Sequence, residues 1–387
     1  MNILIAPDSF KECLSATAVA EHIAVGIRSV LPEAGLQKIP LADGGEGLLE
    51  AILANTKGKR VAVEVLDPLC RKIKADYGII SNGKTAIIEM AKASGIELLK
   101  ESEKNPLQTT TYGTGQLIRD ALDKGCTKLV IGIGGSATND GGMGMIRALG
   151  AKFLDKTGVE IGQGGGSLNE LHHIDLTAFD QRLKRCEVVV ACDVSNPLTG
   201  ENGASYVYGE QKGGNPKQLS VLDQNLTHYA DVLKSTLGIE VRHIPGSGAA
   251  GGTGAALLAF MKGTLKPGID LILETLQVEK GMQWADLVIT GEGKIDAQTL
   301  QGKTIAGIAR MAKRHQVPVI VITGKVGENI DEIYDLGVSA IFSIVNQPMP
   351  LETAIKQAPR LIENCVINIM KAMKIFGVPY SKIENRK

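Results

Sequence analysis

The sequence predicts an α/β protein with two domains, one doubly wound around a parallel sheet and one built on a mixed sheet. Three observations carry this prediction. Strand-like and helix-like segments alternate at both ends of the chain, as in flavodoxin-like or Rossmann-like sheets. Three strand-like runs, residues 60–69, 72–81 and 84–93, follow one another with no helix between them. The 387 residues also exceed what one hydrophobic core usually serves.

Both ends of the chain supply elements of the doubly wound domain. At the N-terminus, an apolar strand ending at Pro7 precedes a helix marked by Val19, Ile23, Ile27 and Val30. A second strand-and-helix pair follows over residues 36–58. The C-terminal part is expected to contain strands at residues 286–293, 317–325 and 339–346 and helices at 304–314 and 351–376. We therefore expect one domain from residues 1–69 and 282–387.

Residues 70–281 are expected to form an inserted domain, with the active site in the cleft between the two domains. After the three consecutive strands, helix and strand alternate again. The expected elements are a helix at 115–125, strands at 128–135 and 187–193, and a long helix at 216–237.

Composition narrows the class of function. Lysine plus arginine and aspartate plus glutamate both total 42, so no net field attracts nucleic acid or an anionic membrane. The apolar start lacks a signal-peptide pattern, and no apolar run is long enough to span a bilayer. The 6 cysteines are scattered and the 6 histidines form no ligand pattern for a transition metal. We expect a cytoplasmic protein that binds a small molecule, and the sequence leaves open whether it forms a homo-oligomer.

Glycine is concentrated in four loops that follow apolar strands. The chain has 46 glycines, well above the usual ~7% of residues. They gather at residues 42–47, 132–144, 246–254 and 291–296. Glycine lets backbone N–H groups approach a phosphate closely. A single loop of this kind is usually only a tight turn, but four together favour an anionic, nucleotide-like ligand.

Two familiar nucleotide motifs carry little weight in this sequence. Residues 78–85 fit the P-loop formula, but Asn82-Gly83 is a strong hairpin signal and a strand-like run continues from Thr85. Residues 132–137 and 246–251 match the dinucleotide fingerprint without a clearly placed acidic residue about twenty positions further on. A nicotinamide-dependent oxidoreductase is therefore a minority interpretation.

Carboxylates at strand ends are more informative. They are Asp8, Asp43, Asp140, Asp193, Glu292 and Asp296, and each follows a strand or lies in a glycine-rich loop. A single one is most often a helix cap. Several, beside glycine loops and Lys11, Lys212 and Lys303, match the needs of phosphoryl transfer, with carboxylates for Mg²⁺ and lysines near phosphates. The residues alone thus predict a phosphotransferase acting on a small metabolite.

The motifs then resemble, in order and over most of the chain, the type-1 glycerate kinase family. The segments are APDSFKECLSA from Ala6, LADGGEG from Leu41, GIGGSATNDGGMGM from Gly132, ACDVSNPLTGENGA from Ala191, GEQKGG from Gly209, GAAGGTGAAL from Gly248 and DLVITGEGKIDAQTLQGK from Asp286. The resemblance implies an ATP- and Mg²⁺-dependent kinase that converts D-glycerate to 2-phosphoglycerate. The chain departs from the family pattern in two places: Glu12-Cys13 stands where the family usually has Gly-Ser, and Glu210 stands where it often has Pro.

Roles for individual residues follow from this match as hypotheses. Asp193 is the expected base near the glycerate hydroxyl, because it ends a strong strand and its loop lacks a helix-cap pattern. The other expected catalytic residues are Lys11 and Asp43, and the expected substrate-binding residues are Asp8, Asp140 and Asn139. The expected nucleotide-binding residues are Gly134, Gly135, Ser136, Gly291 and Lys303, and the expected metal ligands are Glu292 and Asp296. Three alternatives remain open here: a kinase giving 3-phosphoglycerate, an oxidoreductase, and a non-catalytic protein that binds a small acid.

Overall fold

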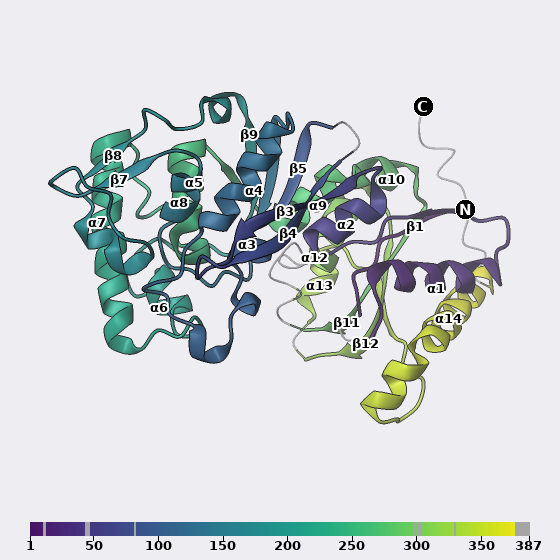
Figure 1. Cartoon of the computed structure of the whole chain (residues 1–387). Helices are drawn as coiled ribbons and strands as arrows, with labels where there is room; N and C mark the ends of the chain where they lie inside the picture. The colour runs from purple at the N-terminus through teal and green to yellow at the C-terminus, as the bar shows by residue number, and fades with distance from the viewer. Residues whose placement is uncertain are drawn as a thin grey trace. The chain divides into compact units, whose positions relative to one another are not determined.

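The computed structural model (Figure 1) divides into two compact units. It describes residues 1–10, 13–42, 47–80, 83–296, 299, 304–328 and 330–375. Unit 1 comprises residues 1–43, 50–55 and 269–387, and unit 2 comprises residues 44–49 and 56–268.

Unit 1 is built on a parallel five-stranded sheet in the order β13-β12-β11-β1-β2. Its strands are β1 (Asn2–Ile5), β2 (Gly35–Lys38), β11 (Leu287–Ile295), β12 (Val319–Val326) and β13 (Ala340–Ser343). The N-terminal strand β1 lies between β2 and β11, with Ile3 opposite Leu287. The two ends of the chain therefore build one sheet, as the sequence predicts.

Helices cover both faces of this sheet. They are α1 (Ala16–Arg28), α2 (Leu48–Asn55), α9 (Gly268–Thr275), α10 (Val278–Trp284), α12 (Thr304–His315), α13 (Glu332–Asp335) and α14 (Leu351–Ile375). On one face, Ile3 and Ile5 share a core with Ile23 of α1 and Val366 of α14. Figure 1 shows purple α1 and yellow α14 side by side. Alternate strand residues such as Leu4 are buried toward the other face, where α10 and α12 pack, so the sheet is doubly wound.

Unit 2 contains a mixed six-stranded sheet in the order β10-β9-β6-β5-β4-β3. Its strands are β3 (Lys59–Leu66), β4 (Lys72–Ile79), β5 (Thr85–Glu89), β6 (Lys128–Gly132), β9 (Glu187–Ala191) and β10 (Thr264–Lys266), beside the separate pair β7 (Lys152–Leu154) and β8 (His173–Asp175). Strands β10, β9, β6 and β5 are parallel, whereas β3 and β4 are antiparallel to their neighbours. The predicted fold class, with one parallel and one mixed sheet, is confirmed.

The helices of unit 2 have well-defined ends. They are α3 (Ala91–Ser94), α4 (Tyr112–Asp123), α5 (Met143–Ala148), α6 (Ala204–Tyr208), α7 (Pro216–Leu237) and α8 (Ala249–Met261), with 3-10 turns η1 (Ile96–Leu98), η2 (Glu101–Glu103), η3 (Gly165–Glu170) and η4 (Gln181–Arg185). Helix α7 has the bounds expected from the sequence. Asn215 caps it in a capping box with Gln218, Pro216 occupies the first turn, and Gly238 ends it in a left-handed conformation.

The unit boundaries lie near residues 56 and 268 rather than at the expected 69 and 281. Strand β3 pairs with β4 along its whole length, from Lys59 opposite Ile79 to Leu66 opposite Lys72, and so belongs to the mixed sheet. At the other boundary, Ile269 packs close to Gly307 of α12. An apolar pattern predicts a strand or a helix but does not state which sheet it joins.

The P-loop-like segment is part of a hairpin. Strand β4 ends at Ile79 and β5 begins at Thr85, and the two strands are antiparallel. Residues 81–82 of the expected turn lie outside the described residues, and Gly83 is left-handed with φ +68°. No helix begins after Gly83, so the sequence-based rejection of a P-loop is confirmed.

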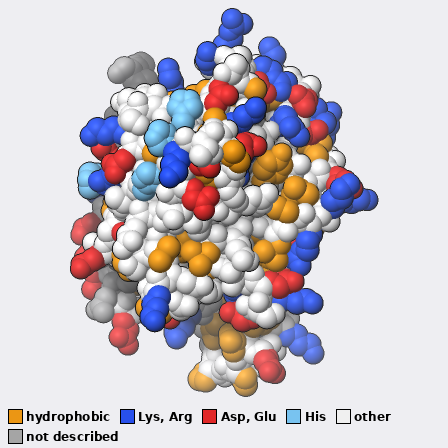
Figure 2. Space-filling model, turned by 60° about the vertical axis from the view of Figure 1, so that its left-hand side comes forward, with side chains coloured by type: hydrophobic (Ala, Val, Ile, Leu, Met, Phe, Trp, Pro, Cys, Tyr) orange, Lys and Arg blue, Asp and Glu red, His pale blue; other side chains and the backbone are white. Residues whose placement is uncertain are grey.

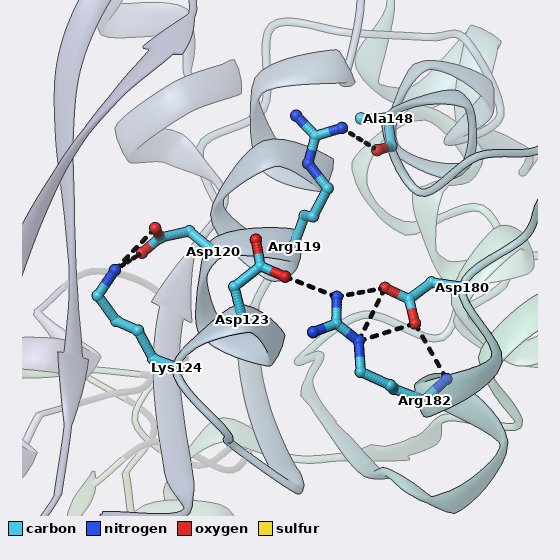
Figure 3. Close-up of polar contacts among 7 residues, drawn as sticks. All are labelled: Arg119, Asp120, Asp123, Lys124, Ala148, Asp180 and Arg182. Carbon is cyan, nitrogen blue, oxygen red and sulfur yellow. Dashed lines mark hydrogen bonds and ion pairs between the residues drawn. The ribbon is translucent and has the colours of Figure 1, made fainter.

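Charged side chains form local pairs on the surface of unit 2. Figure 3 shows Arg182 between Asp123 at the end of α4 and Asp180 at the start of η4, with Nη2 within 2.8 Å of both carboxylates. The Arg182 guanidinium holds the pKa of Asp180 below its usual range. In Figure 2, acidic and basic side chains are interspersed over the face shown, in keeping with equal totals of the two signs.

Candidate functional site

A cavity of about 420 Å³ opens in unit 2 at the carboxyl ends of the parallel strands β6 and β9. Ligands of open α/β sheets bind at this edge. The lining residues are Ile96, Ile133, Gly134, Gly135, Ser136, Ala191, Cys192, Asp193, Val194, Tyr208, Gln211, Lys212, Ala249 and Ala250. The cavity therefore brings together five residues named from the sequence: Gly134, Gly135, Ser136, Asp193 and Lys212.

The loop after β6 contributes backbone donors to the cavity wall. Gly135 is left-handed with φ +67°, which favours glycine. Its carbonyl accepts a hydrogen bond from the N–H of Ile96, so the η1 segment holds the loop. Among the described residues, the N–H groups of Gly134 and Gly135 have no acceptor. Such groups can bind an anion such as phosphate.

Asp193 is exposed in the loop that follows β9. Its Oδ1 accepts a 2.8 Å hydrogen bond from the N–H of Gly268, the first residue of α9. Its own loop lacks a capping pattern, but the carboxylate caps a helix 75 residues further along the chain. This bond orients the carboxylate at the cavity wall.

Lys212, named from the sequence only as one of three lysines expected near phosphates, is buried at the cavity wall. It is 2% exposed, and its Nζ donates to Ser136 Oγ at 2.9 Å and to the Thr138 carbonyl at 2.7 Å. The turn between α6 and α7 directs it inward, with Gly213 left-handed against the Lys104 backbone. Burial lowers the pKa of Lys212 to about 7, while the nearby Asp140 acts in the opposite direction. In the sequence, this lysine is distinguished only by its place between glycines.

Asp140 has a different environment from the one expected. It is fully buried and does not line the cavity. Its carboxylate accepts from the N–H and Oγ1 of Thr111 at 2.9 Å each, from the N–H of Gly142 at 3.1 Å and from that of Gly144 at 3.2 Å. Burial raises its pKa, and these donors partly oppose the rise. The geometry does not support the expected contact with metal or substrate, because the carboxylate ties α4 to the start of α5.

Asn139 is also buried away from the cavity. Its Nδ2 donates to Ser205 Oγ at 3.2 Å, which links the glycine loop to α6. Asn139 does not line the cavity, so the structure gives no support to its expected contact with substrate.

Many loop glycines serve packing rather than ligand binding. Ala250, Gly251 and Gly252 are all left-handed, which kinks the start of α8. A Cβ on Gly251 would lie 2.0 Å from the Thr138 carbonyl, and one on Gly252 would lie 2.9 Å from Gly141 Cα. The loops at 132–144 and 246–254 thus interlock, with the Gly141 N–H bonded to the Gly251 carbonyl. The second dinucleotide-like match is part of this packing.

Three of the other expected acids lie in unit 1: Asp8 follows β1, Glu292 lies in the C-terminal half of β11, and Asp296 directly follows β11. Asp8 Oδ2 accepts from Thr304 Oγ1 at 2.5 Å, and the Asp8 N–H donates to the Gly291 carbonyl at 2.8 Å. Glu292 Oε1 accepts from Thr299 Oγ1 at 2.5 Å. Asp296 pairs with Lys294 at 2.7 Å. These contacts place Asp8, Gly291 and Glu292 along one edge of the sheet.

Three expected residues, Lys11, Asp43 and Lys303, lie outside the described residues. Within the described ranges, no group of three or more His, Cys, Asp or Glu side chains is arranged to hold a metal ion. In the same part of the chain, no helix is long and apolar enough to cross a membrane.

Unit 1 also contains a cavity that the sequence did not indicate. Its volume is about 810 Å³, and it lies beyond the carboxyl ends of β11, β12 and β13 beside α14. The wall is largely apolar and includes Phe10, Val326 and Met349, with Lys325 and Asn346 as polar groups. Cys13, one of the departures from the family pattern, lines it and donates from Sγ to the Ile355 carbonyl at 3.5 Å.

Comparison with known proteins gives the site its context. A model of the glycerate kinase family matches residues 3–374. The chain belongs to the glycerate kinase family. It is 49% identical to the glycerate kinase of Bacillus subtilis (strain 168) over 97% of this chain and 98% of that one. It is 49% identical to the glycerate 2-kinase of Escherichia coli (strain K12) over 92% and 94% of the two chains.

A solved structure supports the same conclusion for the fold. A crystal structure of a Salmonella typhimurium LT2 protein provisionally named glycerate kinase 2 superimposes with a TM-score of 0.88 at 46% identity. The match covers 97% of this chain and 99% of that one. The resemblance drawn from the motifs is confirmed, and this member of the glycerate kinase family is a kinase that uses a nucleotide cosubstrate.

Membership of a kinase family makes the P-loop-like segment directly testable. Lys84→Ala should leave kcat and the KM for the nucleotide cosubstrate within about twofold of wild type, because Lys84 is exposed in the β4–β5 hairpin. A true P-loop lysine contacts the β- and γ-phosphates. Steady-state kinetics at varied concentrations of the nucleotide checks this, and a loss above tenfold in a folded variant would restore the P-loop interpretation.

Proposed function

We propose that this kinase transfers the γ-phosphoryl group of ATP to the 2-hydroxyl of D-glycerate, giving 2-phosphoglycerate. The observation that carries the proposal is the shared cavity of unit 2, where Asp193 and the Gly134–Ser136 loop line one space. A carboxylate that can accept a proton and backbone donors that can hold a phosphoryl group are both required for this transfer. The identity with a relative named glycerate 2-kinase favours the 2-position over the 3-position.

In this mechanism Asp193 accepts the proton of the attacking hydroxyl. Its bond to the Gly268 N–H keeps the carboxylate oriented before substrate binds. The N–H groups of Gly134 and Gly135 hold the phosphoryl oxygens as charge moves onto them. Ser136 contributes indirectly, since its hydroxyl accepts from Lys212.

The carboxylates of unit 1 fit a role in holding Mg²⁺. Protein sites for Mg²⁺ commonly use one or two carboxylates together with phosphates and water, so a cluster of three acids is not required. Glu292 and Asp296 are our candidates for holding Mg²⁺. Asp8, whose N–H bonds to the Gly291 carbonyl, is our candidate for binding substrate at the same edge of the sheet. Bound Mg²⁺ would neutralise charge on the nucleotide phosphates. Roles for Lys11, Asp43 and Lys303, and the cytoplasmic location, stay predictions.

The identity of the product shows which hydroxyl group of D-glycerate is phosphorylated. Purified protein with Mg²⁺, ATP and D-glycerate should consume ATP, and enolase alone should convert the product at once. Conversion that needs phosphoglycerate mutase as well would mean transfer to the 3-hydroxyl. A folded protein that consumes no ATP with D-glycerate would refute the proposed reaction.

A further inference from the structure

The proposed reaction brings two carboxylates into the cavity of unit 2, that of Asp193 and that of the substrate. The proposed base, Asp193, is a carboxylate in the cavity wall, and D-glycerate brings a second carboxylate one bond from the reacting carbon. Two negative groups this close repel each other unless a cation lies nearby. Among the described residues that line the cavity, Lys212 is the basic one.

The direct hydrogen-bond partners of Lys212 are neutral, and the nearby buried Asp140 acts on it only through space. An ammonium group has three donors, and Nζ uses two of them on neutral acceptors, Ser136 Oγ and the Thr138 carbonyl. No carboxylate of the described residues forms an ion pair with it. Burial still outweighs the influence of Asp140, and a buried cation without a directly bonded counter-charge is costly unless a ligand provides one.

We propose that Lys212 binds the carboxylate of the acid substrate, and thereby positions the substrate's 2-hydroxyl toward Asp193. This inference rests on the proposed function and names the group that recognises the acid. Lys212 and Asp193 line the same small cavity. The two neutral acceptors hold the ammonium in place before substrate arrives and leave its third donor for a ligand.

Substrate binding should then be linked to protonation of Lys212. Its pKa of about 7 in the ligand-free protein means that much of the amine is neutral at pH 8. A carboxylate at Nζ favours the charged form, so binding should take up a proton. The other titratable groups facing Lys212 and the cavity are Asp140, Asp193, Cys192 and Tyr208. Burial raises the pKa of Cys192 and of Tyr208, which keeps both neutral near pH 7.

Steady-state kinetics of Lys212→Met provides the first test. We expect the KM for D-glycerate to rise about 10- to 100-fold, the range for losing a hydrogen bond to a charged group, with the KM for ATP within about threefold. Lys124→Met, which removes an exposed lysine directly after α4 that pairs with Asp120, is the control and should leave both constants unchanged. A rise confined to the KM for ATP would instead assign Lys212 to a nucleotide phosphate and overturn the proposal.

Calorimetry of the wild type provides a test that does not need the variant to fold. D-glycerate binding measured at pH 8 in two buffers of different ionisation enthalpy should show uptake of about one proton, falling toward zero at pH 6. The uptake should persist in Asp193→Asn and vanish in Lys212→Met. Glycerol, which lacks the carboxylate, should show no uptake. D-glycerate binding without proton uptake at pH 8 would refute the proposal.

The outcomes separate this inference from the proposed function. Wild-type turnover of D-glycerate with an unchanged KM in folded Lys212→Met leaves the kinase reaction standing and removes Lys212 from acid recognition. Wild-type protein that binds D-glycerate with proton uptake but consumes no ATP refutes the reaction and retains the anion site.

Discussion

Asp193→Asn is expected to lower kcat by about 10²- to 10⁴-fold, the usual contribution of a general base. Asparagine keeps the shape of the side chain, and its carbonyl can still accept the N–H of Gly268, so the loop after β9 should keep its conformation. What is lost is the ability to take the proton of the substrate hydroxyl. Steady-state kinetics at saturating ATP and varied D-glycerate measures the effect, with little change expected in the KM for D-glycerate.

A matched control for Asp193 exists in the same unit. Asp223 also accepts a hydrogen bond from a glycine N–H, that of Gly200, at 2.9 Å, but it does not line the cavity. Asp223→Asn should leave kcat within about twofold. If folded Asp193→Asn retained more than a tenth of wild-type kcat, Asp193 would not be the base.

Asp140→Ala is expected to destabilise the protein by about 3–5 kcal/mol. Truncation leaves the N–H groups of Thr111, Gly142 and Gly144 without their acceptor in a fully buried place, and each unsatisfied buried donor costs about 1–3 kcal/mol. Urea unfolding followed by circular dichroism measures the change. Asp155→Ala, at an exposed turn, is the control and should shift the midpoint only slightly.

Asp140→Asn separates a structural role from a catalytic one. Asparagine can keep one acceptor oxygen near Thr111, but its amide group then faces the N–H of Gly142. We expect an intermediate loss of stability and near-normal turnover per folded molecule. Normal stability combined with a loss of activity above 100-fold would instead return Asp140 to the substrate or metal site.

Local signals in the sequence predicted most individual elements. Helix α7 shows why: Asn215, Pro216 and Gly238 mark its two ends, and such signals act over only a few residues. The antiparallel arrangement of β3, β4 and β5 likewise followed from strand-like runs without an intervening helix. The unit boundaries were less predictable, because the pairing of β3 with β4 depends on partners that an apolar pattern does not specify.

The site was predicted only in part, since burial is decided by residues distant in the chain. Asp193 and Asp140 both follow an apolar strand in the sequence, Asp193 almost directly and Asp140 within a glycine-rich loop. Thr111, at the start of α4, donates two hydrogen bonds to the buried Asp140 carboxylate, whereas Asp193 lines the cavity. Lys212 is buried against Ser136, 76 residues away. Neither contact has a signature in the local sequence.

The pairing of β1 with β11 has a consequence for the protein while it is still being synthesised. The ribosome must add about 250 residues after β2 before β11 exists, which takes roughly 12–50 s at 5–20 residues per second. All strands of unit 2 lie between Lys59 and Lys266 and emerge within that interval. Strand β1 can pair with β2 early, but its other partner, β11, is made only after the whole of unit 2, and for that time this edge of β1 is exposed to other chains and to chaperones.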